Sequence, residues 1–166
     1  MGHPVLRTKA RALERSEITS PAIQKLIDDM IETMTEYHGV GLAAPQIHEG
    51  LRLFVAALDV DDEGRGLEPV PVINPEITPI GREMVEDWEG CLSIPDIRGL
   101  VARARDIKVR AYDRRGERVE LEAHDFAARV IQHETDHLDG VLFLDRMRSL
   151  ASLTFLDEYS RYWVKD

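Results

Sequence analysis

The sequence contains very little cysteine and no long apolar run. Cys91 is the one cysteine among its 166 residues, so no disulfide can form within the chain. A shortage of cysteine favours a reducing compartment, and we expect a cytoplasmic protein. No apolar run approaches the roughly 18 residues of a transmembrane helix, and residues 1–7 lack the apolar core of a secretory signal. These absences predict that the protein does not enter a membrane.

Basic residues are also in short supply. Lys and Arg number 21 against 31 Asp and Glu, which gives a formal net charge of −10. Because affinity for a nucleic-acid backbone comes from Lys and Arg side chains, this balance argues against a specific nucleic-acid partner. One stretch is locally basic and carries Arg98, Arg103, Arg105, Lys108 and Arg110. Much of it alternates as a strand does, so we interpret it as a solvated sheet face.

The length and composition are those of one globular domain, which we place over residues 1–166. Ser20 predicts the start of a helix, apolar residues recur every three or four positions after it, and Gly39 predicts its end. Apolar segments predict short strands over 51–58, 70–74, 77–80, 100–105, 108–112 and 118–123. Prolines in and around the second and third of these strands favour an edge or a bent position. Residues 59–66 predict a solvated acidic loop.

The strongest motif is Gln132-His133-Glu134-Thr135-Asp136-His137, which contains a His-Glu-x-x-His core. On a helix, residues four apart lie one turn above each other, so His133 and His137 face the same way. Two imidazoles on one face can hold a metal ion, and Glu134 lies within reach of a water on that metal. Asp136 lies either behind the ligands or on the helix surface, and we favour the surface.

The residues around this motif support a helix. Four of them fall at i, i+4, i+7 and i+11 on one stripe: Phe126, Val130, His133 and His137. Asp125, just before the stripe, predicts the N-cap, and Gly140, just after it, predicts the stop. Together with the strands, this helix predicts an α+β fold, a single domain of mixed or antiparallel sheets packed around a central metal-binding helix.

A third ligand would decide what the histidine pair does. Cys91 follows Gly90 in an expected extended turn, and a thiolate there would complete a site with one open position, as catalytic metal sites have. A zincin-type endopeptidase instead draws its third ligand from downstream, where this chain offers no His or Cys. The acids available there include Asp139, Asp145, Asp157 and Glu158. A non-enzymatic module with a structural metal would need four protein ligands and would have no use for Glu134.

Three stretches, Gly39–Gln46, Glu89–Ser93 and Gln132–His137, coincide in order with a known set of motifs. On these residues the sequence resembles the peptide deformylases, over roughly residues 3–148. The resemblance implies a small α+β domain that removes the formyl group from the N-terminal formylmethionine of nascent peptides and releases formate. It also implies one divalent metal per chain, Fe²⁺ in the cell, with Zn²⁺, Ni²⁺ or Co²⁺ able to replace it in purified protein.

The resemblance also implies catalytic roles. It assigns the metal to Cys91, His133 and His137. It makes Glu134 the general base and acid for a metal-bound hydroxide that acts as the nucleophile. It places the Gln46 side chain and the backbone N–H of Leu92 in the oxyanion pocket. Glu89 and Arg103 match an ion pair that braces these motifs.

Substrate contacts follow in the same way. The residues matched to the extended peptide and its continuation are Val40, Gly41 and Arg98. A methionine side chain needs an apolar slot, for which Val130 and Phe126 are candidates, although ordinary core packing explains them nearly as well. Trp88 lies either at the rim of the site or as a plug in the sheet.

After Arg148 the chain ends in a short tail of mixed charge with several aromatic residues. Some bacterial deformylases carry a longer, basic C-terminal helix that docks on the ribosome. The short tail and the acidic net charge put such docking in doubt here, so we expect at most a weak, transient ribosome contact.

Overall fold

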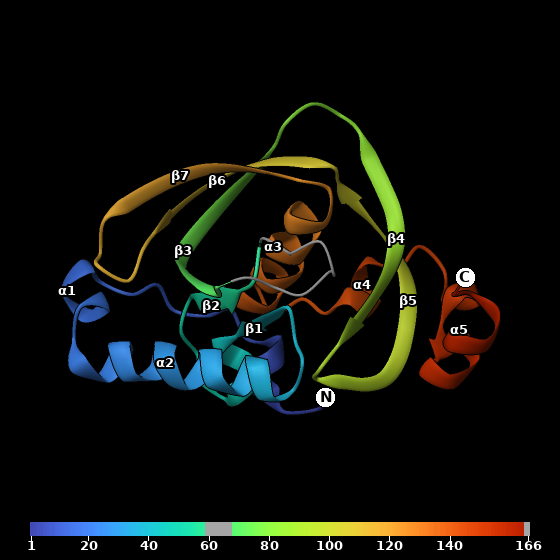
Figure 1. Cartoon of the computed structure of the whole chain (residues 1–166), viewed down its shortest axis with the longest axis horizontal. Helices are drawn as coiled ribbons and strands as arrows, with labels where there is room; N and C mark the ends of the chain where they lie inside the picture. The colour runs from blue at the N-terminus through green and yellow to red at the C-terminus, as the bar shows by residue number, and fades with distance from the viewer. Residues whose placement is uncertain (59–67, 165–166) are drawn as a thin grey trace.

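Two antiparallel sheets and one buried helix make up the computed structural model, which describes residues 1–58 and 68–164 (Figure 1). The larger sheet contains, in spatial order, β1 (Gly41–Ala43), β2 (Leu53–Ala56), β3 (Val70–Pro79), β6 (Asp106–Tyr112) and β7 (Arg118–His124). The smaller sheet contains β4 (Met84–Cys91), β5 (Ile94–Ala104) and β8 (Thr154–Phe155). Helix α3 (Asp125–Leu138) packs against strands of both sheets. The predicted α+β class is therefore confirmed.

The other helical segments surround this centre. They are α1 (Arg15–Ile18), α2 (Pro21–Glu36), α4 (Phe143–Arg146), α5 (Leu156–Tyr162) and the 3₁₀ turns η1 (Pro4–Arg7), η2 (Ala44–Ile47) and η3 (Leu150–Ser152). Within residues 1–58 and 68–164, none of these helices has both the length and the apolar character needed to cross a membrane.

Helix α2 begins where the sequence predicts. The Ser20 hydroxyl accepts a hydrogen bond from the backbone N–H of Ile23 at 3.4 Å, which caps the first turn. The buried stripe of α2 consists of Ile23, Ile27, Met30 and Met34. The helix ends before Gly39, because His38 adopts the left-handed conformation (φ 54°) that a glycine usually takes at a helix end.

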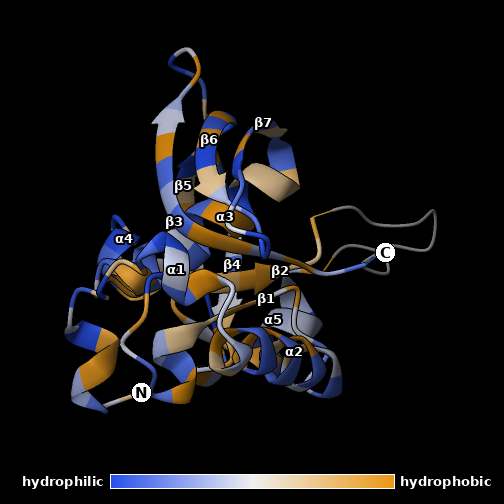
Figure 2. Cartoon of the chain, turned by 90° about the vertical axis from the view of Figure 1, so that its left-hand side faces the viewer, coloured by the Kyte–Doolittle hydropathy of each residue, from blue (hydrophilic) through white to orange (hydrophobic). Residues whose placement is uncertain are grey.

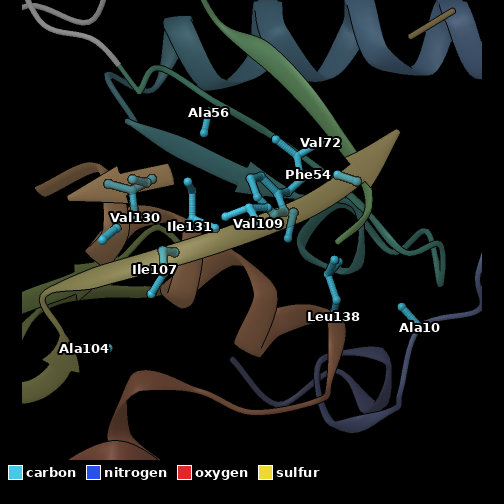
Figure 3. Packing of buried hydrophobic residues seen from close by; sticks show 14 residues of the cluster. Ala10, Phe54, Ala56, Val72, Ala104, Ile107, Val109, Val130, Ile131 and Leu138 are labelled. Carbon is cyan, nitrogen blue, oxygen red and sulfur yellow. The ribbon is translucent and has the colours of Figure 1, made fainter. Parts of the chain in front are cut away.

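An apolar core fills the space between the larger sheet and α3. Phe54 on β2, Val72 on β3 and Val109 on β6 pack with Ile131 on α3, and each is at most 5% exposed (Figure 3). Strand β2 is hydrophobic along its length (Figure 2), because α3 covers one of its faces and α2 covers the other. Full burial of a side chain such as Phe54 stabilises the fold by roughly 2–3 kcal/mol. This packing fixes α3 relative to the strands that carry the site.

The proline-rich strand β3 lies inside the sheet, so its predicted edge position is wrong. It pairs with β2 on one side and with β6 on the other. The predicted bend is present, because the pairing register shifts between Ile73 and Glu76, and Pro75 falls within this irregularity, where it interrupts no regular ladder. Asn74 there adopts φ 50°, and its side chain bonds the backbone N–H and C=O of Leu13 at 2.9 and 2.8 Å.

Among the elements that the sequence pattern misses are β4 and the C-terminal helix α5. The first four residues of β4 are all exposed, so no apolar alternation marks them as a strand. Helix α5 is short and has no fully buried residue. The acidic loop predicted over 59–66 lies outside the described residues.

Candidate active site

Helix α3 and the end of β4 bring three metal-ligating side chains together. His133 and His137 lie one turn apart on α3, and Cys91 is the last residue of β4. One ligand atom from each lies within 4.8 Å of the others, and Cys91 Sγ is 3.3 Å from His137 Nε2. Ligands of one tetrahedral ion with bonds of about 2.0–2.3 Å lie roughly 3.5 Å apart, so this donor set fits one divalent cation. Within the described part of the chain, no other group of His, Cys, Asp and Glu has this spacing.

The charges around the two imidazoles differ. Burial lowers the pKa of His137 to about 3, so this ring is neutral and can ligate. Burial also acts to lower the pKa of His133, but hydrogen bonds to Cys91 and Glu89 outweigh it and raise the pKa to about 10. The position between Cys91 and Glu89 therefore favours a positive charge, which a metal cation can provide in place of a proton.

The ends of α3 differ slightly from the prediction. The helix begins at Asp125 itself, with His124 rather than Asp125 at the N-cap, and Gly140 (φ 73°) follows its end as predicted. On the predicted stripe Val130 is buried at 5% exposure, whereas Phe126 is 49% exposed.

A buried carboxylate orients His133. Glu89 Oε2 accepts a hydrogen bond from His133 Nδ1 at 2.9 Å, which leaves the other ring nitrogen free for a metal. Glu89 also accepts two hydrogen bonds from Arg103, at 2.9 and 3.0 Å, and one from Arg129, at 2.8 Å. Burial acts to raise the pKa of Glu89, but the hydrogen bonds from His133 and Arg103 hold it at about 2. The predicted pair of Glu89 and Arg103 is therefore confirmed.

The sequence analysis does not single out Arg129. Its place on the helix indicates that its side chain is buried and must be paired. It stands one turn before His133 on the same face of α3 and is 8% exposed. Besides Glu89, it donates to the backbone oxygens of Val101 and Val85, at 2.9 and 2.7 Å. Arg129 thus ties α3 to both long strands of the smaller sheet.

The surface placement predicted for Asp136 is wrong, because α3 is covered on the side away from the metal as well. Asp136 is 7% exposed and accepts hydrogen bonds from Arg103 and Arg146. The interpretation of the basic stretch as a solvated face also fails for Arg103, which is 5% exposed, and for the half-buried Arg98. It holds better for the residues that pair with surface acids: Arg105, Lys108 and Arg110.

Glu134 lies against a glycine that leaves room for its carboxylate. Its side chain is buried, and among the described residues its Oε2 has no hydrogen-bond partner. A Cβ added to Gly41 would lie 2.4 Å from Glu134 Oε1, so a side chain there would displace the carboxylate. Burial raises the pKa of Glu134 to about 7, which suits a group that takes and returns a proton near neutral pH.

Gln46 points its amide nitrogen at the same centre. Its Oε1 accepts a hydrogen bond from Ala43 N at 2.8 Å, which fixes the orientation of the amide. The Nε2 then lies 3.6 Å from Cys91 Sγ and 3.2 Å from Ser93 Oγ. Leu92 and Ser93 form the tight turn between Cys91 and Ile94, so the backbone of Leu92 lies directly beside the sulfur.

These groups open onto a cavity of about 540 Å³. The predicted site residues that line it are Val40, Gly41, Gln46, Trp88, Cys91, Leu92, Arg98, Phe126, Val130, His133 and Glu134. His137 lies beneath them at 1% exposure. Trp88 is half-buried and lines the cavity, which favours a position at the site over a plug within the sheet. The wall also contains Tyr37, His38 and Leu156, which the sequence alone does not reveal.

A cysteine sulfur, two imidazoles, a buried carboxylate and an oriented amide around one cavity define a class of protein, the metal-dependent hydrolases. Comparison with known proteins narrows the class. Residues 1–152 match the family model described as polypeptide deformylase. The chain belongs to the polypeptide deformylase family and is a peptide deformylase enzyme, as the sequence motifs predict. The endopeptidase and structural-metal alternatives are thereby set aside.

Individual relatives cover nearly the whole chain. It is 44% identical to peptide deformylase 2 of Nostoc sp., over all of this chain and 93% of that protein. It is 48% identical to the peptide deformylase of Thermotoga maritima, over 88% of this chain and 83% of that protein.

Solved structures agree with these relatives. The crystal structure of the Thermotoga maritima enzyme superposes with a TM-score of 0.81 at 46% identity, covering 90% of this chain and 95% of that one. A class I type b peptide deformylase from Acinetobacter baumannii, with Met-Ala-Ser bound, gives a TM-score of 0.82 at 39% identity, covering 89% and 94% of the two chains.

Proposed function

We propose that this enzyme removes the formyl group from the N-terminal formylmethionine of nascent peptides and releases formate. The supporting observation is the buried carboxylate of Glu134 beside the Cys91, His133 and His137 cluster, at the floor of an open cavity. The Acinetobacter baumannii relative binds Met-Ala-Ser, which is the peptide left when formyl-Met-Ala-Ser loses its formyl group. The nascent substrate and the single cysteine favour the cytoplasm as the site of action.

Cys91, His133 and His137 would hold one divalent cation. When bound there, a divalent cation supplies a water of lowered pKa and polarisation of the formyl oxygen. The thiolate and imidazole donors accept several first-row metals. We propose Fe²⁺ in the cell, with Zn²⁺, Ni²⁺ or Co²⁺ able to occupy the site in purified protein.

Glu134 moves the proton in this mechanism. Its carboxylate accepts a proton from the attacking water and then donates it to the departing amine nitrogen, so that formate and a free N-terminus are produced. The Oε2 atom, which has no partner among the described residues, is available for this hydrogen bond. The pKa of about 7 supports both halves of the transfer.

Two donors would stabilise the negative charge that develops on the formyl oxygen. The Gln46 amide, held by Ala43, and the backbone N–H of Leu92 both lie beside Cys91. Donors that are oriented before the reaction cost no reorganisation, and removal of one typically lowers the rate by about a hundredfold to a thousandfold.

The peptide would bind as an extended strand between Val40–Gly41 and the end of β4. Val130 and Phe126 would contact the methionine side chain, and Arg98 the peptide further along. The guanidinium of Arg98 lies against Gly90, where an added Cβ would be 2.1 Å from Nη1. For the ribosome we propose at most a weak, transient contact, because the net charge is −10.

The test is formate release from formyl-Met-Ala-Ser, measured alongside internal cleavage of an unblocked peptide. We expect formate from the wild type, no internal cleavage, and a rate at least a hundredfold lower in Glu134→Gln, which keeps the size of the side chain but cannot take the proton. Metal analysis of the variant must show retained metal. Peptide cleavage without formate release would disprove the proposal.

A further inference from the structure

The chain continues beyond the family match at residue 152 and there forms β8 and α5. Strand β8 pairs with β5 through Ile97 with Phe155 and Arg98 with Thr154. This pairing attaches α5 to the smaller sheet, where Figure 1 shows it beside β5. Leu156, the first residue of α5, lines the cavity. The segment outside the family match therefore reaches the candidate active site.

One side of α5 and of the turn that ends it faces the cavity wall. Leu156, Tyr159 and Trp163 stand at i, i+3 and i+7, which places them on one face. Tyr159 and Trp163 pack on Trp88, with ring centroids 5.1 and 5.3 Å apart. Leu156 and Trp88 both line the cavity. The aromatic contacts hold α5 in place, and Leu156 is thereby presented to the cavity.

The distance along β4 indicates which part of a substrate would reach this wall. Trp88 precedes Cys91 by three residues, which is about 10 Å along a strand. If the formyl group lies at Cys91, an extended peptide would bring its third residue to the same level. Asp96 and Arg98 also line the cavity, and their opposite charges favour neither sign of substrate charge. Apolar contact is therefore the selective feature.

We propose that Leu156 and Trp88 form a specificity-determining wall that favours an apolar or aromatic third residue in the substrate. This inference rests on the proposed deformylation. It goes beyond that function because it assigns selectivity among formylated peptides to Leu156, a residue outside the family match.

The test compares formyl-Met-Ala-Phe with formyl-Met-Ala-Ser. In the wild type we expect kcat/KM to be about threefold to tenfold higher for the phenylalanine peptide, through a lower KM, from the apolar area that its ring would bury. Leu156→Gln, of similar size but polar, and Leu156→Ala should both bring this ratio close to one. Tyr162→Ser is the matched control, because Tyr162 lies on the same helix, is 67% exposed and does not line the cavity. It should keep the wild-type ratio.

The outcomes separate the two proposals. If neither peptide releases formate, deformylation itself is refuted. If both peptides release formate with equal kcat/KM in the wild type, or if both Leu156 variants keep the wild-type ratio, the wall is refuted while deformylation stands. If the Leu156 variants lower kcat equally for both peptides and leave the ratio of kcat/KM unchanged, Leu156 has a structural role, and the inference is also overturned.

Discussion

Replacement of Glu89 by glutamine tests whether the buried carboxylate holds the metal-binding helix in place. The side chain is 4% exposed and accepts hydrogen bonds from His133, Arg103 and Arg129 at 2.8 to 3.0 Å. A glutamine has one acceptor oxygen, and its amide nitrogen would face an N–H donor. Glu89→Gln would therefore leave buried guanidinium charge without a full counter-charge.

The expected loss of stability is large. Removal of one partner from a buried ion pair costs about 3–5 kcal/mol. The pKa of Glu89 gives a consistent figure, because its depression from 4.5 to about 2 corresponds to about 3 kcal/mol of preference for the charged form in the folded state. Because His133 also loses the acceptor that orients its ring, metal affinity should fall by roughly tenfold to a hundredfold.

Urea unfolding of metal-free protein at pH 7 measures the stability term, and titration against a chelator measures the metal affinity. Glu120→Gln is the control, because Glu120 pairs with Lys108 and Arg110 at 2.7 and 2.9 Å but is 50% exposed. Its loss should be under about 1 kcal/mol. The limit for Glu89→Gln is set by the same range of about 1 kcal/mol for surface ion pairs. If the free energy of unfolding of Glu89→Gln lies within that range of the wild-type value, the reasoning is refuted.

The pH dependence has a defined sign. Folding lowers the pKa of Glu89, so its contribution to stability is complete above about pH 4.5 and is lost as the pH falls toward 2. The difference in unfolding free energy between wild type and Glu89→Gln should therefore narrow over this range. A difference that widens on acidification would contradict the assignment.

Three further changes have expected outcomes. Gly41→Ala would place a Cβ 2.4 Å from Glu134 Oε1 and should lower kcat at least about tenfold with metal retained, whereas Gly50→Ala, with nothing within 4 Å of its Cβ, should leave kcat unchanged. Cys91→Ser should lose metal as well as activity, because the site loses its only thiolate; metal analysis after dialysis checks this. If the metal is Fe²⁺, activity should fall in air and return on anaerobic addition of Fe²⁺; an air-stable, iron-loaded enzyme would contradict the assignment.

The sequence predicts the parts of the site whose side chains repeat with a regular period or match a motif. His133 and His137 follow from helical spacing, and Cys91 from the position left for a third ligand. The sequence pattern does not reveal which polar side chains are buried by contacts between distant elements. Asp136 looks like a surface residue because an amphipathic pattern assumes one solvated face, whereas α3 has no exposed residue from Ala128 to Leu138.

The same limit applies to the strands. In a regularly paired strand, a proline lacks the N–H that an interior position needs, so the prolines favour an edge position for β3. The register shift around Pro75 removes this requirement, and β3 lies inside the sheet. Strand β4 carries no apolar alternation, because its first four residues face solvent. Glu89 near the end of β4 accepts hydrogen bonds from residues of β5 and α3. The family resemblance implies the partner Arg103, but the local pattern does not reveal Arg129.

The buried charges behind the metal ligands are balanced among themselves. Glu89 pairs with Arg103 and Arg129, and Asp136 pairs with Arg103 and the half-exposed Arg146. The buried Glu134 adds one further carboxylate in this region. A network of paired charges can fix the orientation of His133 with little net charge near a bound cation, so Cys91 would be the one ligand of the cluster that supplies a negative charge. Neutralisation of Glu89 would upset both functions together, since it would release the imidazole and leave excess positive charge beside a metal cation. Stability and metal affinity should therefore fall together in Glu89→Gln, and this coupling is what distinguishes a bracing network from an ordinary buried ion pair.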